Sequence, residues 1–203
     1  MSHRIITIGR QFGSGGRQLG QRLSQELHIP MYDRELVEMA ADKLGLSPVS
    51  IEKVDESALN TFLATYQLPL NTGFPESYGL PLNDTAYLAQ SSIIETLAKR
   101  GSCIIIGRCG DYVLRDNPDC INVFICASME DRKKRIMERY HMKEREAVSA
   151  IKSADKRRKN YYETYTGRKW GSIDSHQMLL NISLLGEDTA AYLIRSLYEA
   201  PAI

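Results

Sequence analysis

Short runs of apolar, β-branched residues alternate along the chain with stretches in which apolar residues recur every three or four positions. Ile5–Ile8 is the first such run, and Leu19, Leu23 and Leu27 follow at helical spacing. Such a run is typical of a strand buried on both faces, and such a spacing is typical of one face of a helix. The beginning of the chain therefore predicts a buried strand followed by an amphipathic helix.

The same alternation continues to the end of the sequence. Further strands are predicted at residues 31–33, 103–106, 121–126 and 178–182. Helices are predicted at residues 34–44, 84–100, 112–115, 129–140, 144–162 and 187–199. Strands that alternate with helices form parallel βαβ units. The pattern predicts an α/β fold with a doubly wound parallel sheet of about five strands.

Two regions interrupt this alternation. Residues 67–83 contain three prolines and two glycines with little periodicity, which is typical of a lid, a binding loop or a disordered stretch. Residues 129–170 form two highly charged helical segments. We therefore expect a single domain whose core comprises residues 1–46, 84–128 and 171–203, with insertions at residues 47–83 and 129–170.

Charge is the feature of the composition that changes this picture. The 203 residues include 26 basic and 25 acidic side chains, a net charge of +1, which by itself argues against an anionic partner. However, residues 129–170 hold 14 of the basic and 7 of the acidic side chains, so this segment carries +7 and the rest of the chain −6. The near-neutral total conceals a basic segment that needs an explanation.

The rest of the composition is that of an average soluble domain. The four cysteines, Cys103, Cys109, Cys120 and Cys126, include no C-x-x-C pair, so we expect reduced and mostly buried thiols. The N-terminus has no signal-peptide pattern, and no apolar run approaches the ~20 residues that span a bilayer. These features predict a cytoplasmic protein with no membrane partner.

The candidate for chemistry is the glycine-rich segment between the first strand and the first helix. It contains Gly13, Ser14, Gly15 and Gly16, and α/β folds bind phosphate at this place because backbone N–H groups and a helix N-terminus converge there. The dinucleotide-binding pattern G-x-G-x-x-G fits poorly, because Gln18 replaces the third glycine and the loop begins too far beyond the strand. A mononucleotide loop is the better interpretation.

The mononucleotide pattern, the P-loop G-x-x-x-x-G-K-[ST], fits the length of the segment. Gly16 stands where the lysine is expected, Arg17 stands where the Mg²⁺-binding Ser or Thr is expected, and Arg10 replaces the leading glycine. If the loop is one residue longer than the pattern, Arg17 supplies the phosphate cation and Gln18 follows it. A tight turn that binds no ligand is the alternative.

Five segments in this order resemble the cytidylate kinase-like family of P-loop proteins: Ile6–Arg17, Pro30–Glu35, Ile106–Arg108, Phe124–Ser128 and Asp155–Tyr162. The resemblance covers nearly the whole chain. It implies a P-loop NTPase fold, a three-layer α/β sandwich with nucleoside monophosphate kinase architecture. It also implies that residues 47–83 form a monophosphate-binding insertion and residues 129–170 a basic lid. Members with this loop lack the lysine of true cytidylate kinases.

Two residues at the ends of predicted strands are candidates for the acceptor side. Arg108 directly follows a buried strand, at the edge where open α/β sheets bind ligands, and a surface salt bridge is its alternative role. The resemblance implies that Arg108 holds the acceptor monophosphate, although Cys109 replaces the aspartate that follows this arginine in true cytidylate kinases. Asp33 would help to position Mg²⁺ or a water, and its alternative role is the N-cap of the next helix.

The basic segment gains a role on this architecture. Guanidinium groups suit phosphate geometry, and a hinged basic lid can close over ATP and exclude water. By resemblance Arg132 lies against the donor base, and Arg157 and Arg158 reach the transferred phosphate. The alternatives are a solvated face whose lysines pair with nearby acids, and a nucleic-acid patch in which the aromatic residues of 161–170 stack on bases.

The sequence thus predicts an enzyme that transfers a phosphoryl group from ATP to (d)CMP, with Mg²⁺ bridging the phosphates. Residues 13–18 and Arg132 would bind ATP, and Arg17, Arg157 and Arg158 would act in catalysis. The expected partners are small-molecule nucleotides, nucleic acid is less favoured, and the oligomeric state is left open. A nucleotide- or anion-binding protein that has lost catalysis is the alternative, because Gly16 cannot supply the charge of lysine.

Overall fold

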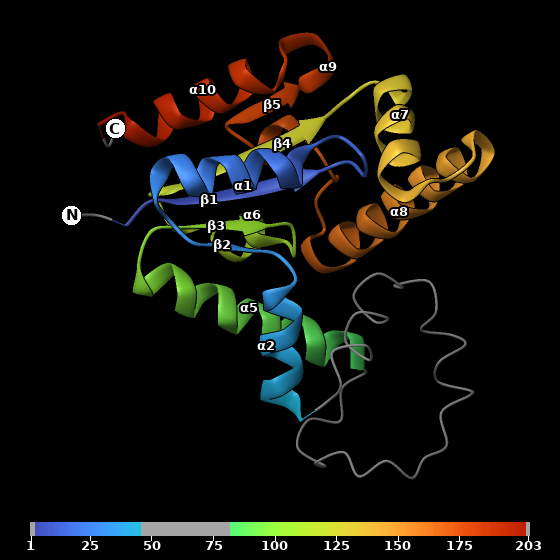
Figure 1. Cartoon of the computed structure of the whole chain (residues 1–203). Coiled ribbons are helices and arrows are strands. Elements are labelled where there is room, and N and C mark those ends of the chain that lie inside the picture. The colour runs from blue at the N-terminus through green and yellow to red at the C-terminus, as the bar shows by residue number, and fades with distance from the viewer. Residues whose placement is uncertain (1–2, 46–81, 202–203) are drawn as a thin grey trace, which may run out of the picture.

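The computed structural model describes residues 3–45 and 82–201, and in this part of the chain a five-stranded sheet lies between helices (Figure 1). The strands are β1 (Ile5–Arg10), β2 (Met31–Tyr32), β3 (Cys103–Ile106), β4 (Cys120–Cys126) and β5 (Met178–Asn181). Each strand is parallel to its neighbours, in the order β2-β3-β1-β4-β5. The predicted doubly wound parallel sheet is confirmed.

Helices cover both faces of the sheet. They are α1 (Gly16–Leu27), α2 (Glu35–Leu44), α5 (Leu82–Arg100), α6 (Gly110–Val113), α7 (Met129–Tyr140), α8 (Glu144–Thr166), α9 (Ile182–Leu185) and α10 (Glu187–Glu199), with a 3-10 turn at Ile173–Ser175. Helices α1 and α10 cover one face, and α2 and α5 cover the other (Figure 1). Helices α7 and α8 lie beyond the carboxyl ends of the strands (Figure 1).

Strand β1 lies at the centre of the sheet because its side chains are apolar on both faces. Ile5 packs in the cluster under α2 and α5, whereas Ile6 and Ile8 pack in the cluster under α1 and α10, and all three are fully buried. Burial of each such side chain is worth about 1.5–3 kcal/mol. The strand continues two residues beyond the predicted run, since Gly9 and Arg10 still pair with β4. Its polar end thus reaches the carboxyl edge of the sheet.

Several boundaries differ from the predicted ones. Helix α5 begins at Leu82, two residues before the predicted start, and α8 continues to Thr166, where Gly167 ends it in the left-handed conformation. The helix after β3 is Gly110–Val113 instead of residues 112–115, because left-handed backbone at Cys109 starts it early. The end of the last predicted strand forms α9, whose N-cap is Asn181.

The two predicted insertions are described to different extents. Of residues 47–83, only Leu82 and Asn83 belong to the described residues, as the start of α5, so the prediction for the rest lies outside them. Residues 129–170 comprise α7 and α8. The division into core, monophosphate-binding insertion and lid stays a prediction.

The four cysteines are free thiols, and three of them are buried, as predicted. Burial raises the pKa of Cys103 to about 11 and that of Cys120 to about 12, so both thiols stay protonated at neutral pH. A protonated, buried thiol is a poor nucleophile and behaves as a small apolar side chain. Within the described ranges, no helix combines the length and the apolar character needed to cross a bilayer.

Candidate active site

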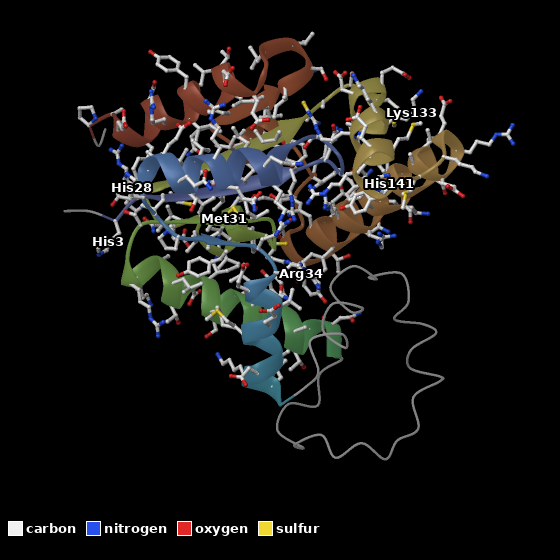
Figure 2. All side chains as sticks on the ribbon, in the orientation of Figure 1. His3, His28, Met31, Arg34, Lys133 and His141 are labelled. Atoms are coloured by element: carbon white, nitrogen blue, oxygen red, sulfur yellow. The ribbon has the colours of Figure 1, made fainter. Side chains whose placement is uncertain are left out.

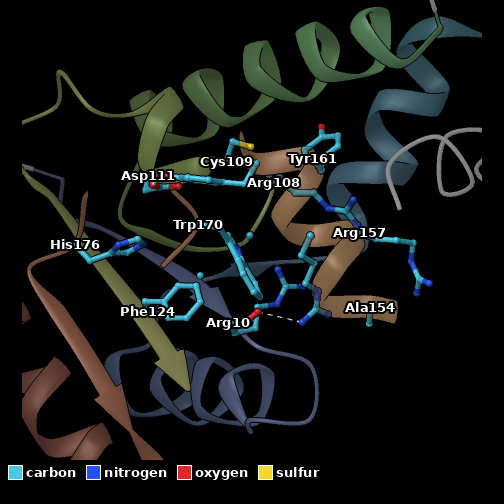
Figure 3. A pocket seen from close by; sticks show the side chains of 14 residues that line it. Arg10, Arg108, Cys109, Asp111, Phe124, Ala154, Arg157, Tyr161, Trp170 and His176 are labelled. Carbon is cyan, nitrogen blue, oxygen red and sulfur yellow. Dashed lines mark hydrogen bonds between the residues drawn. The ribbon is translucent and has the colours of Figure 1, made fainter. Parts of the chain in front are cut away.

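A pocket lies at the carboxyl ends of β1, β3 and β4, where α8 faces the edge of the sheet (Figure 3). The basic residues that line it are Arg10, Arg108, Arg157 and Arg158, and the aromatic ones are Phe124, Tyr161, Tyr162, Trp170 and His176. The arginines come from the end of β1, the turn after β3, and α8. The fold therefore brings together four cations from three distant segments of the sequence, and the sequence predicted three of these cations as site residues.

The glycine loop connects β1 to α1. Gly13 and Gly15 have φ angles of 77° and 92°, and this left-handed region is readily accessible only to glycine. Helix α1 begins at Gly16, and no side chain in the described part of the chain caps it. The side chain of Ser14 is fully buried, and its hydroxyl has no hydrogen-bond partner among the described residues. Such an orphaned group is destabilising by about 1–3 kcal/mol, and an anion at the helix N-terminus would satisfy it.

Asp33 holds two arginines at the end of β2. Its carboxylate is 2.7 Å from Nε of Arg17 and 3.4 Å from Nη2 of Arg10, and the residue is buried. Asp33 is not the N-cap of α2, since Arg34 occupies that position, so its alternative role is wrong. The carboxylate instead fixes one cation from the first turn of α1 and one from the end of β1.

A metal site made only of protein side chains is not present among the described residues, where no group of three or more His, Cys, Asp or Glu side chains could hold an ion. His3, His28 and His141 lie on separate parts of the fold (Figure 2). Mg²⁺ is commonly held by one or two carboxylates together with substrate phosphates. Asp33 is the candidate carboxylate here, but both of its oxygens pair with arginines in this structure, so it fits an ion held through water better than direct coordination.

Arg132 fastens the glycine loop to α7 and α8. Its Nε donates to the carbonyl of Phe12 at 2.8 Å, and Nη2 pairs with Asp155 of α8. Asp155 in turn accepts the backbone N–H of Phe12 at 2.7 Å. Arg132 is only 4% exposed, so its guanidinium is committed to these partners in this structure. Its predicted contact with the donor base stays a prediction.

Arg135 stands over the glycine loop, and sequence reasoning did not single it out. Its Nη1 donates to the carbonyl of Gly13 at 2.6 Å, and its guanidinium lies 3.4 Å from the place that a Cβ on Gly15 would occupy. In the sequence it is one of several cations in a basic run. Its position three residues after Arg132, on the same face of a helix, is the signal that could have identified it.

The turn after β3 is strained and presents Arg108 to the pocket. Gly107, Arg108 and Cys109 have φ angles of 69°, 56° and 54°, and a non-glycine residue in this region is destabilising by about 1–3 kcal/mol. Burial raises the pKa of the Cys109 thiol, so it is no replacement for the charged aspartate of true cytidylate kinases. Arg108 therefore lies on a fixed, tight turn at the carboxyl edge of the sheet.

The two α8 arginines have different contacts. Arg158 donates from Nη1 to the carbonyl of Arg10 at 3.1 Å, shown by the dashed line in Figure 3, and its guanidinium lies 5.5 Å from the ring centre of Phe12. Arg157 donates to the hydroxyl of Ser153 at 2.7 Å. Both line the pocket. Arg158 thus links α8 to the end of β1, whereas the bond from Arg157 to Ser153 lies within α8 itself.

The aromatic residues of α8 pack against the core. Tyr161 and Tyr162 are buried in a cluster with Cys109, and Tyr162 donates to Asp111 Oδ2 at 2.6 Å. Tyr165 donates to Asp84 of α5 at 3.0 Å. Burial raises the pKa of Tyr161 and Tyr162. These contacts fit the packing interpretation of the tyrosines: Tyr161 and Tyr162 are buried, and Tyr165 is half-buried.

A glycine loop at a helix N-terminus, next to an arginine-rich pocket at the carboxyl edge of a parallel sheet, defines the class of P-loop kinases. The comparisons agree with this class. Residues 5–184 match the model of the cytidylate kinase-like family, and the chain belongs to that family. Membership of this family and the P-loop kinase fold support a kinase-like phosphotransferase.

Solved structures resemble the chain over nearly its whole length. An uncharacterized protein from Eubacterium ventriosum ATCC 27560 is 28% identical, with a TM-score of 0.72 over 98% of this chain and 99% of that one. Shikimate kinase from Bacteroides thetaiotaomicron is 12% identical, with a TM-score of 0.55 over 97% and 99%. A sugar kinase from Janibacter sp. HTCC2649 is 16% identical, with a TM-score of 0.55 over 98% and 97%. No curated protein matches the sequence.

Proposed function

We propose that this protein uses ATP to convert (d)CMP to (d)CDP, with ADP as the second product. The observation that carries the proposal is the pocket beside the glycine loop. Its lining residues include four arginines and one acidic side chain, Asp111. A surplus of positive charge in a partly enclosed site favours a polyanionic ligand. Membership of the cytidylate kinase-like family supports a nucleoside monophosphate as the acceptor.

The ATP phosphates bind, in this proposal, at residues 13–18. The backbone N–H groups of the glycine loop and of the first turn of α1 are the donors, and the orphaned hydroxyl of Ser14 is available to a phosphate oxygen. Mg²⁺ that arrives with ATP neutralises charge on the phosphates. Asp33 would hold that ion through water, and Arg132 is the candidate for contact with the donor base.

The acceptor monophosphate binds to Arg108. The pocket has a volume of about 80 Å³, whereas sites for drug-sized ligands measure roughly 300–1,000 Å³. In this proposal a nucleotide enters as α8 moves away from the sheet, which breaks the bond from Arg158 to the carbonyl of Arg10. This movement is what the predicted lid of residues 129–170 would supply.

Catalysis in this proposal is positioning and electrostatic stabilisation. In the transfer, an oxygen of the acceptor phosphate forms a bond to the γ-phosphorus as the bond to the leaving ADP oxygen breaks, and the charge spreads over the equatorial oxygens. Arg157 and Arg158 on the lid, with Arg17 at the loop, stabilise that charge. Closure of the lid excludes water and so prevents hydrolysis of ATP.

The test is ADP release from Mg-ATP with a panel of acceptors. The panel contains CMP, dCMP, UMP, AMP and GMP, together with shikimate and gluconate because shikimate and sugar kinases share the fold. We expect turnover with CMP or dCMP to exceed that with every other acceptor. Turnover with shikimate or gluconate alone would replace the proposed acceptor. No ADP release with any acceptor would overturn the enzymatic function.

One observation favours a second candidate function, nucleotide binding without catalysis. Gly16 stands where P-loop kinases carry lysine, and a missing cation weakens stabilisation of the transition state. This candidate predicts that ATP raises the unfolding temperature through binding to the native state, while no acceptor yields ADP. Thermal unfolding with and without Mg-ATP, beside the acceptor panel, separates the two functions.

A further inference from the structure

Arg10 and any side chain at position 16 compete for one space. A Cβ added to Gly16 would lie 2.8 Å from Cβ of Arg10 and 3.3 Å from Cβ of Ile125, and real Cβ atoms essentially never approach other atoms as closely as the first distance. Both neighbouring atoms are attached directly to strand backbone in the centre of the sheet, so neither can move aside. The place where a P-loop lysine would begin is therefore filled by the stem of Arg10.

The Arg10 side chain runs from the glycine loop to the acceptor side of the pocket. A side chain at Gly107 would collide with Arg10 Nη1, so the guanidinium passes directly over the turn that presents Arg108. Nη2 lies 3.4 Å from Asp33, and 16% of the side chain is exposed. The absence of side chains at positions 16 and 107 thus creates a channel that this arginine fills.

Arg17, the other cation beside Asp33, differs from Arg10 in its exposure and in its position relative to the pocket. It begins one residue inside α1, and 39% of its side chain is exposed. Arg10 lines the pocket, and Arg17 does not. Of the two arginines that share a carboxylate, only Arg10 spans the distance between the glycine loop and the turn at Arg108.

We propose that Arg10 replaces the P-loop lysine and that Gly16 is the residue that permits it. This inference rests on the proposed function and adds a residue to its machinery. The guanidinium contacts the transferred phosphoryl group between donor and acceptor, where charge develops. A guanidinium fork binds two phosphate oxygens at once and keeps its protons throughout, and Asp33 fixes its orientation. A protein without the P-loop lysine thereby retains a cation for the phosphoryl-transfer step.

Calorimetric binding of Mg-ATP to purified variants tests the replacement. Arg10→Met removes the charge and keeps most of the volume, and we expect a loss of about 10- to 100-fold in affinity, the range for charge-assisted hydrogen bonds. Gly16→Lys should lose affinity as well, because the lysine cannot enter beside Arg10. Arg10→Gly combined with Gly16→Lys rebuilds the ordinary loop and should recover most of the loss. Arg22→Met is the control, since Arg22 is on α1 and pairs with Glu26 and Asp188.

ATP binding by the wild-type protein distinguishes failure of the Arg10 proposal from failure of the proposed function. If the wild type binds ATP and Arg10→Met binds it equally well, the role of Arg10 is overturned and the proposed function stands. If the wild type binds no ATP, both are overturned.

A stability measurement without nucleotide tests the steric premise by itself. Gly16→Ala should destabilise the wild type more than it destabilises the Arg10→Gly background, because the second change removes the closer collision and leaves only the contact with Ile125. Equal destabilisation in both backgrounds would overturn the exclusion between the two positions. Because this measurement does not use the Arg10→Met protein, it tests the steric premise even if that variant fails to fold.

Discussion

The arginines on the two sides of the glycine loop differ in burial and in how their carboxylate partners hold them. On the side of α7 and α8, Arg132 is 4% exposed and is bound by Asp155 and the Phe12 carbonyl. On the side of β2, Asp33 is shared by Arg10 and Arg17, whose side chains are 16% and 39% exposed. One carboxylate completes a buried bridge, and the other leaves guanidinium groups partly accessible. The comparison shows that the same pair of residue types can stabilise the loop or equip it for a ligand, according to burial.

The largest expected effect is on the buried side. Asp155→Asn leaves the Arg132 guanidinium buried without its counter-charge, which is destabilising by about 3–5 kcal/mol. Denaturant unfolding measures the loss. Replacing both partners, with Arg132→Met added to Asp155→Asn, should recover part of it, because the uncompensated charge is then gone. A single variant as stable as the wild type would show that the bridge contributes nothing to the loop.

The next effect is on the pocket side and concerns function rather than stability. Arg108→Met should raise the KM for the acceptor about 100-fold by removing charge-assisted hydrogen bonds to its phosphate, with the affinity for ATP nearly unchanged. Steady-state kinetics with varied acceptor measures this. Arg115→Met is the matched control, because Arg115 is exposed and pairs with Asp116. An unchanged KM would remove Arg108 from the acceptor site.

A smaller effect is expected from Asp33→Asn, which addresses the comparison directly. Loss of the carboxylate leaves Arg10 and Arg17 more positive but less oriented, and it removes the proposed water-mediated contact with Mg²⁺. The affinity for Mg-ATP should therefore change little, since these effects oppose each other, while kcat falls about tenfold. Calorimetry and initial rates provide the two readouts. A purely structural role would instead lower stability and leave kcat of the folded enzyme unchanged.

The smallest effect is expected at the exposed face of α7. Lys133 pairs with Glu130 at 2.8 Å and with Glu144 at 2.6 Å, and the Lys133 ammonium lowers the pKa of Glu144. Exposed pairs of this kind are worth about 0–1 kcal/mol and are screened by salt. Glu144→Gln should therefore leave the unfolding free energy within the error of the measurement, and a loss comparable to that of Asp155→Asn would contradict the role of burial.

The fold was predictable because its signals are local. Isoleucine-rich runs such as Ile5–Ile8 and residues 103–106 have the pattern of central strands, and Gly45 ends its helix as expected. The boundaries that differed depend on capping. Cys109 starts a helix through left-handed backbone, and Gly167 ends one later than the apolar pattern suggests. At Cys109 such backbone is imposed by the surrounding structure and leaves little trace in residue type, whereas Gly167 is a stop signal that the apolar pattern alone does not include.

The candidate site was predictable only in part. The glycine loop is a contiguous motif, and the resemblance to the family supplied Arg108 and the α8 arginines as candidates, whose roles stay predictions. The sequence indicated Arg10 only as a replacement for the leading glycine of the P-loop pattern. Its proposed role depends on Gly16, which lies six positions away along the chain and adjacent in space. Arg135 was not distinguished from the other cations of its basic run, because its contact with Gly13 joins segments that are distant in the sequence.

The exclusion between Arg10 and position 16 has a consequence for how such a loop can evolve. At positions 10 and 16 a lysine-bearing loop and this one differ by two substitutions, and each single change leaves either a collision or no cation at these two positions. The two positions are therefore epistatic, and sequences that carry side chains at both should be rare among relatives. The family's phosphate loop would then persist as one of two self-consistent types, with no gradual series between them.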